Sequence, residues 1–355
     1  MQNPKFINKQ EEITIAGAGI SGLTAGIILA QHGYLVTIYE KRSRVGSFFK
    51  KDIHTLRNYP YDFDVIKKFE ELGIKISYYY PIFRETRFSP SLQHVQIYSE
   101  DEPLFYNIIR GYADERSLDN VLLSQAKKNG VEVKFSSAAS SKKSDVDIIA
   151  TGATKKQVFG YGHHFQNISI ESHSLYYFLK SINASYTFSY VVPFSEKEAS
   201  VMIVTLQHQN KRIIEQEFNA LINENRFIRE AINGADFENE TYGYASFQVL
   251  DSAVKKNQFY VGGAAGFLDG ATYYGTHYAI LSGYCAAQSI LRNQNYDILW
   301  KETFGEELQQ RMNRRKQLEK LGIHGQNQII DKLVKTYGNK VTLKEYKEFT
   351  HTLKI

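Results

Sequence analysis

Cysteine is almost absent from this sequence, since Cys285 is the only one among 355 residues. An intramolecular disulfide is therefore excluded, and a cysteine-based metal site is not expected, so we predict no metal. A chain without disulfides is typical of a reducing compartment, which predicts a cytoplasmic location. We interpret Cys285 itself as a buried, unreactive thiol rather than a redox partner.

Long apolar runs are missing as well. No stretch approaches the roughly 18 consecutive apolar residues that a membrane-spanning helix needs, so no transmembrane segment is predicted. Residues 1–10 are polar and lack the apolar centre of a secretory signal. Hydrophobic residues still make up 43% of the chain, which is enough to form a sizeable globular core.

An excess of positive charge is confined to the C-terminus. Residues 301–355 carry twelve Lys or Arg against seven Asp or Glu, while the whole chain has a net charge of +5. Such a region is either a solvated helical face, which we favour, or a surface for peripheral contact with anionic membrane lipids. No nucleic-acid-binding module is present, so no nucleic-acid partner is expected.

The hydrophobic patterns predict alternating strands and helices. A strand at Glu11–Ala16, a helix at Leu23–His32 and a strand at Tyr34–Tyr39 form a βαβ unit. Residues 42–61 have no clear periodicity, and the chain beyond Asn295 is predicted to be helical and peripheral. The other predicted helices are Asp62–Leu72, Ser117–Asn129 with Ser117 as N-cap, Ile213–Asn233 and Thr276–Leu291. The other predicted strands are Ile74–Tyr80, His94–Ser99, Phe105–Ile109, Val131–Phe135, Asp145–Ala150, Tyr186–Val192, Val201–Gln207 and Phe259–Gly262.

A glycine-rich turn joins the first strand to the first helix. The segment GAGISG places Gly17, Gly19 and Gly22 in GxGxxG spacing, and Glu40 closes the second strand. These glycines permit a tight turn, close approach of the backbone to a pyrophosphate, and close packing of helix on strand. The carboxylate of Glu40 is placed to bind a ribose. The motif predicts a dinucleotide but leaves FAD and NAD open.

A second glycine-rich segment, Val261–Gly283, lies far along the chain. A strand ends at Gly262, a turn of small residues follows, and Gly275 precedes a long helix that starts near Thr276. Backbone N–H groups at such a helix start stabilise negative charge, including the anionic edge of a reduced flavin. A plain strand-to-helix connection is the alternative, but together with the first motif the flavin interpretation is favoured.

With these segments the chain resembles the geranylgeranyl-reductase-like branch of the FAD-dependent oxidoreductases, which shares the p-hydroxybenzoate hydroxylase-type fold. The resemblance covers about Glu11 to Leu291. Four places carry it: GAGISGLTAG with Glu40; Val45-Gly46 followed by Phe49; PLFYNIIRG leading to SLDNVLLSQAKKNGVEV; and DIIATGA with VGGAAGFLDGATYYG.

The resemblance implies an α/β fold in which a Rossmann-type FAD-binding domain is interleaved with an antiparallel-sheet substrate domain and followed by a helical C-terminus. Residues 1–70, 105–155 and 258–295 are predicted to form the FAD-binding domain. Residues 71–104 and 156–257 are predicted to form the substrate domain, and 296–355 the basic helical region.

The resemblance also implies which residues hold FAD. The pyrophosphate contacts fall on the first glycine turn, the ribose contact on Glu40, and Arg110 lies along the cofactor, while Asp269 and Gly275 lie by the flavin ring. The complete set of predicted cofactor-binding residues is Gly17, Ala18, Gly19, Ile20, Ser21, Gly22, Glu40, Lys41, Gly46, Arg110, Gly262, Gly263, Asp269, Gly275 and Thr276. In one departure, Gly263 stands where the family usually has an acidic residue that reaches the ribityl chain.

The chemistry that follows is redox chemistry on the flavin. Tyr273, Tyr274 and His277 are candidate proton donors after hydride transfer, with aromatic packing as the alternative. No second GxGxxG unit is present, so NAD(P)H is expected to dock only transiently. We predict a reductase of an apolar, isoprenoid-like substrate, partly because Tyr176–Tyr190 is rich in aromatic residues. The alternatives are a flavin monooxygenase, although its DGxxSxVR motif is missing, and an FAD-fold binding protein without turnover that interacts through Arg311, Arg314, Arg315 and Lys316.

Overall fold

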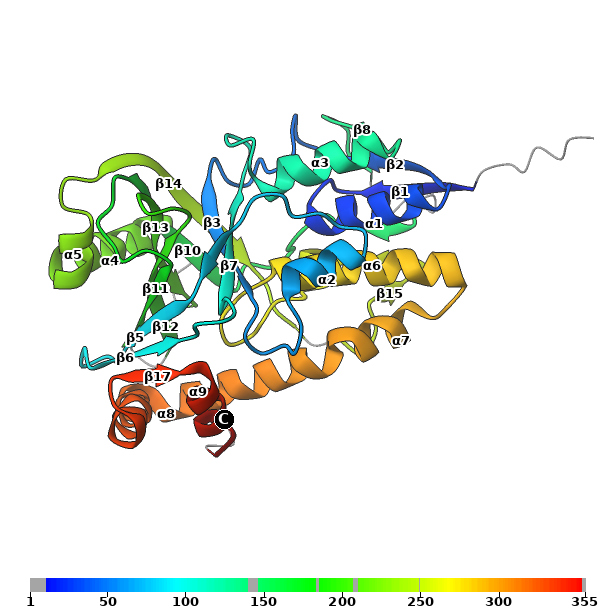
Figure 1. The fold of residues 1–355 in the computed structure, drawn as a ribbon. Coiled ribbons are helices and arrows are strands. Elements are labelled where there is room, and N and C mark those ends of the chain that lie inside the picture. Colours follow the sequence, from blue (N-terminus) through cyan, green and yellow to red (C-terminus); the bar gives the residue numbers. More distant parts are fainter. Residues whose placement is uncertain (1–10, 140–145, 183–184, 207–209, 249, 353–355) are drawn as a thin grey trace, which may run out of the picture.

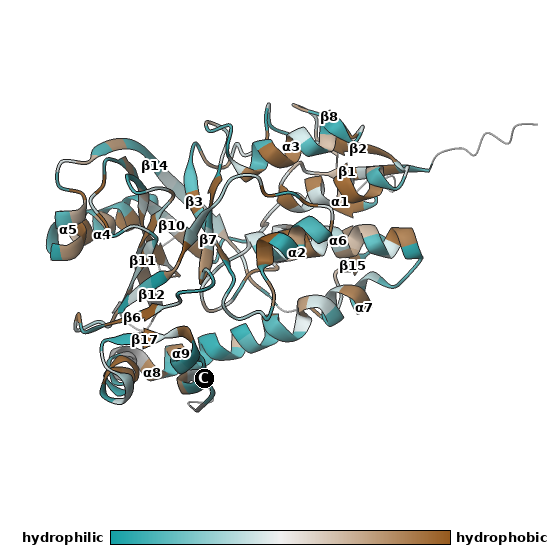
Figure 2. Cartoon of the chain, viewed as in Figure 1, coloured by the Kyte–Doolittle hydropathy of each residue, from teal (hydrophilic) through white to brown (hydrophobic). Residues whose placement is uncertain are grey.

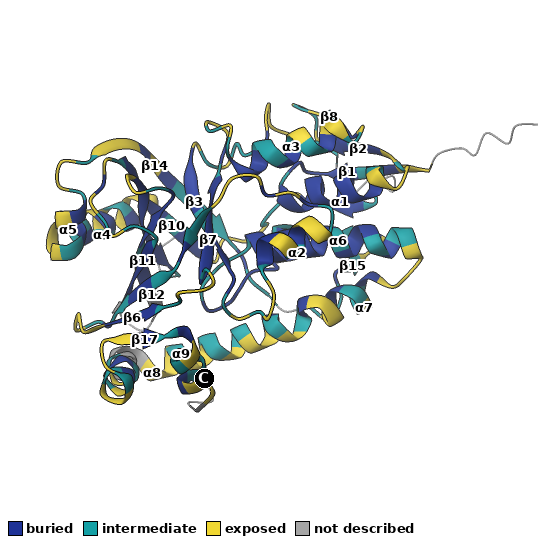
Figure 3. Ribbon diagram, viewed as in Figure 1, coloured by how far each residue is buried: buried dark blue, intermediate teal, exposed yellow. Residues whose placement is uncertain are grey.

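The computed structural model describes residues 11–139, 146–182, 185–206, 210–248 and 250–352. These residues form a six-stranded, an eight-stranded and a three-stranded sheet, with helices packed around them (Figure 1). Buried residues lie both in the helices beside the six-stranded sheet and in the strands of the eight-stranded sheet, where they form separate clusters (Figure 3). The mixed α/β fold predicted from the sequence is therefore confirmed.

The six-stranded sheet contains the predicted βαβ unit. Its central strand β1 is parallel to β2 on one side and to β9 on the other, and the order across the sheet is β15-β16-β9-β1-β2-β8. Only β15 runs antiparallel to its neighbour β16. The strands are β1 (Glu12–Ala16), β2 (Leu35–Tyr39), β8 (Glu132–Lys134), β9 (Ile148–Ile149), β15 (Val254–Lys255) and β16 (Gln258–Tyr260).

Four helices pack beside this sheet. Helix α1 (Ile20–Gln31) contacts both α3 (Leu118–Lys128) and α6 (Thr276–Arg292), and α2 (Val65–Glu71) lies nearby in Figure 1. The hydroxyl of Ser117 accepts a hydrogen bond from Asn120 N at 3.3 Å, so the predicted N-cap of α3 is confirmed.

The eight-stranded sheet has the order β14-β10-β13-β12-β11-β5-β6-β17. Side chains alternate along its strands, so each face has its own core. Tyr176 and Phe178 pack in the cluster formed with α4 (Lys211–Glu224) and α5 (Arg226–Ala231), whereas Leu175 belongs to the opposite cluster. The strands are β5 (Arg84–Phe88), β6 (His94–Tyr98), β10 (Val158–Gln166), β11 (Ser174–Ile182), β12 (Ser185–Pro193), β13 (Glu198–Thr205), β14 (Asp236–Ala245) and β17 (Lys340–Thr342).

The C-terminal region contributes apolar side chains to the cluster that contains Leu175, so the prediction that this region is peripheral was wrong. After α7 (Tyr296–Trp300) and a π-helical turn (Lys301–Gly305), helix α8 (Glu306–Tyr337) crosses beneath the molecule (Figure 1). Hydrophilic residues dominate its crossing part in Figure 2, but its end and α9 (Leu343–Thr352) bury apolar side chains against the sheet. β17 adds an edge strand beside β6.

The third sheet lies between the other two and contains β3 (Asp52–Arg57), β7 (Phe105–Arg110) and β4 (Tyr80–Ile82). β3 falls in the segment for which no element was predicted, because its polar residues hide the alternation of a strand. The strand predicted at Ile74–Tyr80 was also wrong, since only Tyr80 belongs to a strand.

Other boundaries also moved. Asn225 ends α4 and caps α5, so the single helix predicted over Ile213–Asn233 is divided. β13 ends at Thr205, and Asp145 and Gln207, the ends of two predicted strands, lie outside the described residues.

The domain ranges stay a prediction. β15, from the range predicted for the substrate domain, joins the six-stranded sheet, and β17, from the C-terminal range, joins the eight-stranded sheet. Within the described part of the chain, no helix is both long enough and apolar enough to cross a bilayer.

Candidate functional site

A cavity of about 470 Å³ lies where the strands of the six-stranded sheet end. Gly17 follows β1, Glu40 follows β2 and Ala150 follows β9, and all three residues line the cavity. β2 and β9 lie on opposite sides of β1, so the strand order reverses at β1. Open α/β sheets bind ligands at the carboxyl ends of their strands at such a reversal. The opposite wall comes from the eight-stranded sheet.

The first glycine turn can be built only with glycine at two positions. Gly17 has a φ of +105°, and a Cβ there would overlap the carbonyl oxygen of Ala150. A Cβ on Gly22 would overlap the carbonyl oxygen of Gly17, so helix α1 could not begin so close to the strand. The predicted structural roles of the first and third glycines therefore fit the geometry.

Two helix N-termini open on this cavity. α1 begins after Gly19 and α6 after Gly275, and neither has a side-chain cap or an acidic residue in its first turn. Gly19, Gly275 and Thr276 all line the cavity. Uncapped N–H groups and the positive end of a helix dipole attract negative charge, so the cavity offers two separate places for anionic groups.

Glu40 is held beside the first of these places. Its Oε2 accepts a hydrogen bond from Ala18 N and its Oε1 one from Arg42 N, both at 2.9 Å. A carboxylate oxygen can accept a second hydrogen bond, so Glu40 can still bind two hydroxyl groups. Arg42 and Arg44 line the same end of the cavity.

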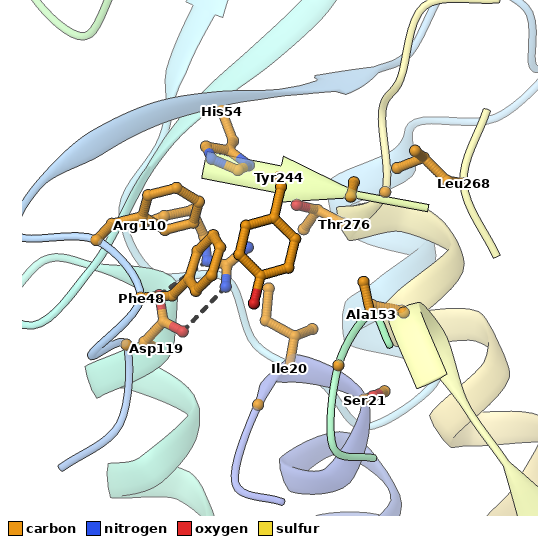
Figure 4. A pocket seen from close by; sticks show the side chains of 18 of the residues that line it. Ile20, Ser21, Phe48, His54, Arg110, Asp119, Ala153, Tyr244, Leu268 and Thr276 are labelled. Carbon is orange, nitrogen blue, oxygen red and sulfur yellow. Dashed lines mark hydrogen bonds and ion pairs between the residues drawn. The ribbon is translucent and has the colours of Figure 1, made fainter. Parts of the chain in front are cut away.

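Aromatic side chains gather above the start of α1 (Figure 4). The rings of Phe48 and Tyr244 are 5.1 Å apart and nearly perpendicular, and His54 and Arg110 lie next to them. Arg110 is anchored by Asp119, with Nε–Oδ2 at 2.8 Å and Nη2–Oδ1 at 3.1 Å. Although burial raises the pKa of Asp119, Arg110 holds it below its usual value. Arg110 thus reaches the cavity with its charge already paired.

The other end of the cavity is apolar. One face of β11, β12 and β13 supplies most of this wall, since alternate residues of a strand share a face. Loop residues before α6 complete it. The side chains of this apolar end are Ile53, Leu175, Tyr177, Phe188, Tyr190, Val192, Val204, Leu268, Tyr273 and Tyr274.

Most predicted site residues line this single cavity. They are Gly17, Ala18, Gly19, Ile20, Ser21, Glu40, Lys41, Gly46, Arg110, Gly263, Tyr273, Tyr274, Gly275 and Thr276. Four others do not line it, namely Gly22, Gly262, Asp269 and His277. Gly22 and Gly262 instead allow close packing, because a Cβ on Gly262 would come within 2.7 Å of Ser21 Oγ.

Asp269 faces away from the cavity, contrary to the expectation that it lies by a flavin ring. Its side chain is fully buried, and Oδ2 lies 2.7 Å from Arg57 Nη2 and 3.4 Å from Arg311 Nε. The carboxylate also accepts hydrogen bonds from the backbone N–H groups of Ala271 and Thr272. Asp269 therefore holds together the loop before α6, β3 and α8.

His277 also points elsewhere, so its expected role as a proton donor has no geometric support. Its ring stacks on Tyr61 at 5.0 Å between centroids and lies 5.2 Å from Phe69. Burial, and secondarily the charge of Arg57, lowers the pKa of His277 to about 3. The ring is neutral near pH 7 and packs in the core between α6 and α2.

Several residues of the cavity were not found from the sequence. They are Arg42, Arg44, Phe48, His54, Thr151, Gly152, Ala153 and Tyr244. Arg42 and Arg44 closely follow Glu40 in the chain, whereas the others come from loops or strands that only the long-range fold brings to the site. Thr151, Gly152 and Ala153 end the segment DIIATGA, which carries part of the resemblance and was a usable signal.

A second polar cluster lies outside the cavity. His164, Glu198 and Glu238 each offer one ligand atom within 4.8 Å of the others, which could suit a metal ion. The ammonium of Lys51 already lies among them, 2.6 Å from Glu198 and 3.2 Å from Glu238. Although burial raises it, hydrogen bonds from His164 and Lys51 lower the pKa of Glu198 to about 2. We therefore interpret the cluster as an ion-pair network.

Comparisons with known proteins agree with this fold. Residues 15–71 match the family described as an NAD(P)-binding Rossmann-like domain. An uncharacterised protein of Methanocaldococcus jannaschii is 26% identical over 178 residues, which is 48% of this chain and 45% of that protein. The match thus spans less than half of that relative.

Solved structures of flavin enzymes share the fold over most of the chain. A geranylgeranyl bacteriochlorophyll reductase-like protein from Thermoplasma acidophilum has a TM-score of 0.76 and 18% identity, covering 97% of this chain and 99% of that chain. A flavin-dependent brominase has a TM-score of 0.66 and 14% identity, covering 92% and 91%. The 2-methyl-3-hydroxypyridine-5-carboxylic acid oxygenase has a TM-score of 0.56 and 16% identity, covering 83% and 87%. The predicted resemblance in fold to the geranylgeranyl-reductase-like proteins is confirmed.

Proposed function

We propose that this chain is an FAD-dependent oxidoreductase. The observation that carries the proposal is the pair of uncapped helix N-termini, α1 and α6, that open on one cavity beside Glu40. NAD requires only the first of them at its pyrophosphate, whereas the anionic edge of a reduced flavin suits the second. When bound, FAD supplies the redox chemistry.

Specific residues would hold the cofactor. The free backbone N–H groups at the start of α1, from Gly19 to Ser21, would bind the pyrophosphate. Glu40 would bind the ribose hydroxyls, and the N-terminus of α6 at Thr276 the flavin edge. Gly263 lines the cavity without offering a side-chain acceptor. The ribityl chain would therefore depend on backbone groups or water near Gly263.

The substrate of this proposal is apolar and isoprenoid-like, because aromatic and aliphatic side chains form the far end of the cavity. Tyr273 and Tyr274 remain the proton donors that reach it. Burial raises the pKa of Tyr274 above its usual value, which keeps its phenol protonated near pH 7. NAD(P)H would dock transiently as the reductant.

A monooxygenase is the second candidate, and the fold shared with an oxygenase favours it.

A binding protein without turnover is the third candidate, motivated by Gly263. Two arginines of the surface proposed for a partner or a membrane pack inward. Arg311 pairs with Asp269, and the guanidinium of Arg315 lies 4.4 Å from the centre of the Phe247 ring. A cytoplasmic location still rests on the single cysteine.

An anaerobic experiment separates these functions. The FAD-loaded protein is reduced with NADPH or dithionite, and geranylgeraniol is added as an isoprenoid probe without oxygen. Reoxidation of the flavin with saturation of a C=C bond supports the reductase. Reoxidation and hydroxylation that require oxygen support the monooxygenase, and neither outcome with tightly bound FAD supports the binding protein.

A further inference from the structure

A second cavity of about 100 Å³ adjoins the apolar end of the large one. Tyr177, Thr272 and Tyr274 line both cavities and form the wall between them. Most of the rest of its lining comes from β3, β5, α8 and α9, so the C-terminal region that was expected to be peripheral helps to enclose it. Four arginines line this small space: Arg57, Arg87, Arg311 and Arg314.

Arg57 is the most deeply placed of the four. Its side chain is 6% exposed, and only Nη2 is paired, at 2.7 Å from Asp269 and 3.5 Å from Glu307. Nε and Nη1 are buried and have no hydrogen-bond partner within the described part of the chain. Buried N–H groups of a charged side chain are costly when unpaired, so this arginine indicates a place for an acceptor.

The charges around the cavity do not balance. Asp269 and Glu307 serve both Arg57 and Arg311, and Glu85 pairs with Arg87 at 2.7 Å. Arg314 has no carboxylate partner among the residues that the structure describes. Four guanidinium groups therefore meet three carboxylates, and one negative charge would complete the set.

A phenol beside the cavity responds to this excess of positive charge. Tyr346 accepts a hydrogen bond from Arg87. Although burial raises it, Arg87 and Arg314 hold the pKa of Tyr346 below its usual value. The local potential thus favours an anion on this side of the cavity.

Part of the lining is an apolar wall. Its side chains are Leu179, Ile329, Ile330, Leu333 and Phe349. One water molecule needs on the order of 10–15 Å³, so the cavity has room for a carboxylate with part of a hydrocarbon chain. A diphosphate would add more negative charge than the single missing one.

We propose that this cavity binds a carboxylate, held by Arg57 and Arg314, with its hydrocarbon part against the apolar wall. The carboxylate belongs either to a small acid that fits entirely inside, or to the head of a substrate whose chain passes Tyr274 into the large cavity. The substrate head group rests on the function proposed above, whereas the small acid does not.

The test uses calorimetric titration of the FAD-loaded full chain with butyrate, dodecanoate and uncharged dodecanol. The main variant is Arg314→Gln. Arg314 pairs with no carboxylate among the described residues, so removing its charge leaves no carboxylate without a counter-charge. The matched control is Lys316→Gln, an exposed residue on the same helix with the same change of charge. Arg57→Met is added as a second variant after its folding has been verified by circular dichroism.

We expect dodecanoate to bind at least about tenfold more tightly than dodecanol. Arg314→Gln should weaken dodecanoate by about tenfold or more and leave dodecanol unchanged, while Lys316→Gln changes neither by more than about twofold. Butyrate binding as tightly as dodecanoate would identify the small acid as ligand. Tighter dodecanoate binding with a shift in the flavin spectrum would identify the head of a substrate.

The proposal is overturned if dodecanoate and dodecanol bind equally, or if the Arg314 and Lys316 variants weaken dodecanoate alike. FAD content, measured separately on each variant, keeps this outcome apart from the flavin function. A protein that binds the carboxylate but no FAD would support the proposed carboxylate site and contradict the proposed oxidoreductase function. A protein that binds FAD but no carboxylate would support the oxidoreductase function and contradict the carboxylate site.

Discussion

Arg57 and Asp269 lie 212 positions apart in the sequence and form a buried ion pair of 2.7 Å between Nη2 and Oδ2. The pair joins β3 to the loop before α6, and Arg311 brings α8 to the same carboxylate. Arg57 also lines the smaller of the two cavities. The conformation of the loop that bears Tyr273 and Tyr274 therefore depends on a contact that no local pattern could reveal.

Replacing Asp269 with Asn should be strongly destabilising. Arg57 would remain buried without its nearest counter-charge, and breaking a buried pair in this way costs about 3–5 kcal/mol. Urea denaturation of both proteins measures the loss. The control is Glu71→Gln, because Glu71 pairs with Lys68 at 3.1 Å on the surface, where such a pair is worth at most about 1 kcal/mol. Equal effects of the two substitutions would contradict the importance of the buried pair.

Replacing Glu40 with Gln should weaken FAD binding without unfolding the protein. One carboxylate oxygen becomes an NH₂ group, which cannot accept the hydrogen bond from Ala18 N or Arg42 N, nor one from a ribose hydroxyl. Loss of a charge-assisted hydrogen bond corresponds to about a 10- to 100-fold weaker affinity. Quenching of FAD fluorescence on titration with apoprotein measures the change. Glu132→Gln, on the neighbouring strand β8, should leave the affinity unchanged.

His277 should make the protein less stable in acid. Its pKa is about 3 in the folded chain and 6.5 ordinarily, so below pH 6.5 the unfolded chain binds a proton that the folded chain does not. The stability contributed by the neutral ring is complete above pH 6.5 and falls by up to about 1.4 kcal/mol per pH unit on acidification.

The comparison uses His277→Phe, which retains the stacking on Tyr61 and cannot titrate. Urea denaturation at pH 6.5 and pH 5 should show a loss for the parent protein that exceeds the loss for the variant by about 1–2 kcal/mol. An identical loss in both would show that the ring is protonated in the folded state. FAD binding should be unaffected, because His277 does not line the cavity.

Lys51 should act as the internal cation of the His164, Glu198 and Glu238 cluster. Lys51→Met removes the nearest counter-charge of the buried Glu198, which keeps only Arg116 at 3.4 Å, and about 1–3 kcal/mol of stability should be lost. Zn²⁺ should raise the melting temperature of this variant but not that of the parent, because the freed ligand atoms lie within 4.8 Å of one another. The exposed Lys211→Met is the control, since its pair with Glu240 is on the surface. Stabilisation of the parent by Zn²⁺ would show instead that the cluster is a metal site.

The part of the site that the sequence predicts is the part that is contiguous in the chain. β1, α1 and β2 form a local unit, so Gly17, Gly19 and Glu40 could be located from spacing alone. Phe48, Tyr244 and the arginines of the second cavity arrive from separate elements, and no pattern within one segment signals their convergence.

Two predicted site residues, His277 and Asp269, lie outside the cavity for specific reasons. His277 follows Thr276, which lines the cavity, but successive residues of a helix are about 100° apart, so His277 points toward α2 instead. The family resemblance placed Asp269 by the flavin ring, whereas its carboxylate is buried against Arg57. The direction of a side chain, unlike the position of its backbone, depends on partners distant in the sequence.

The cofactor content of the protein tests the central claim most directly. The purified chain is incubated with excess FAD, separated from free FAD by gel filtration, and denatured so that the absorbance of the released flavin can be compared with the protein concentration. We predict about one FAD per chain, and clearly less for Glu40→Gln under the same conditions. A folded parent protein that retains no FAD after this treatment would contradict the account.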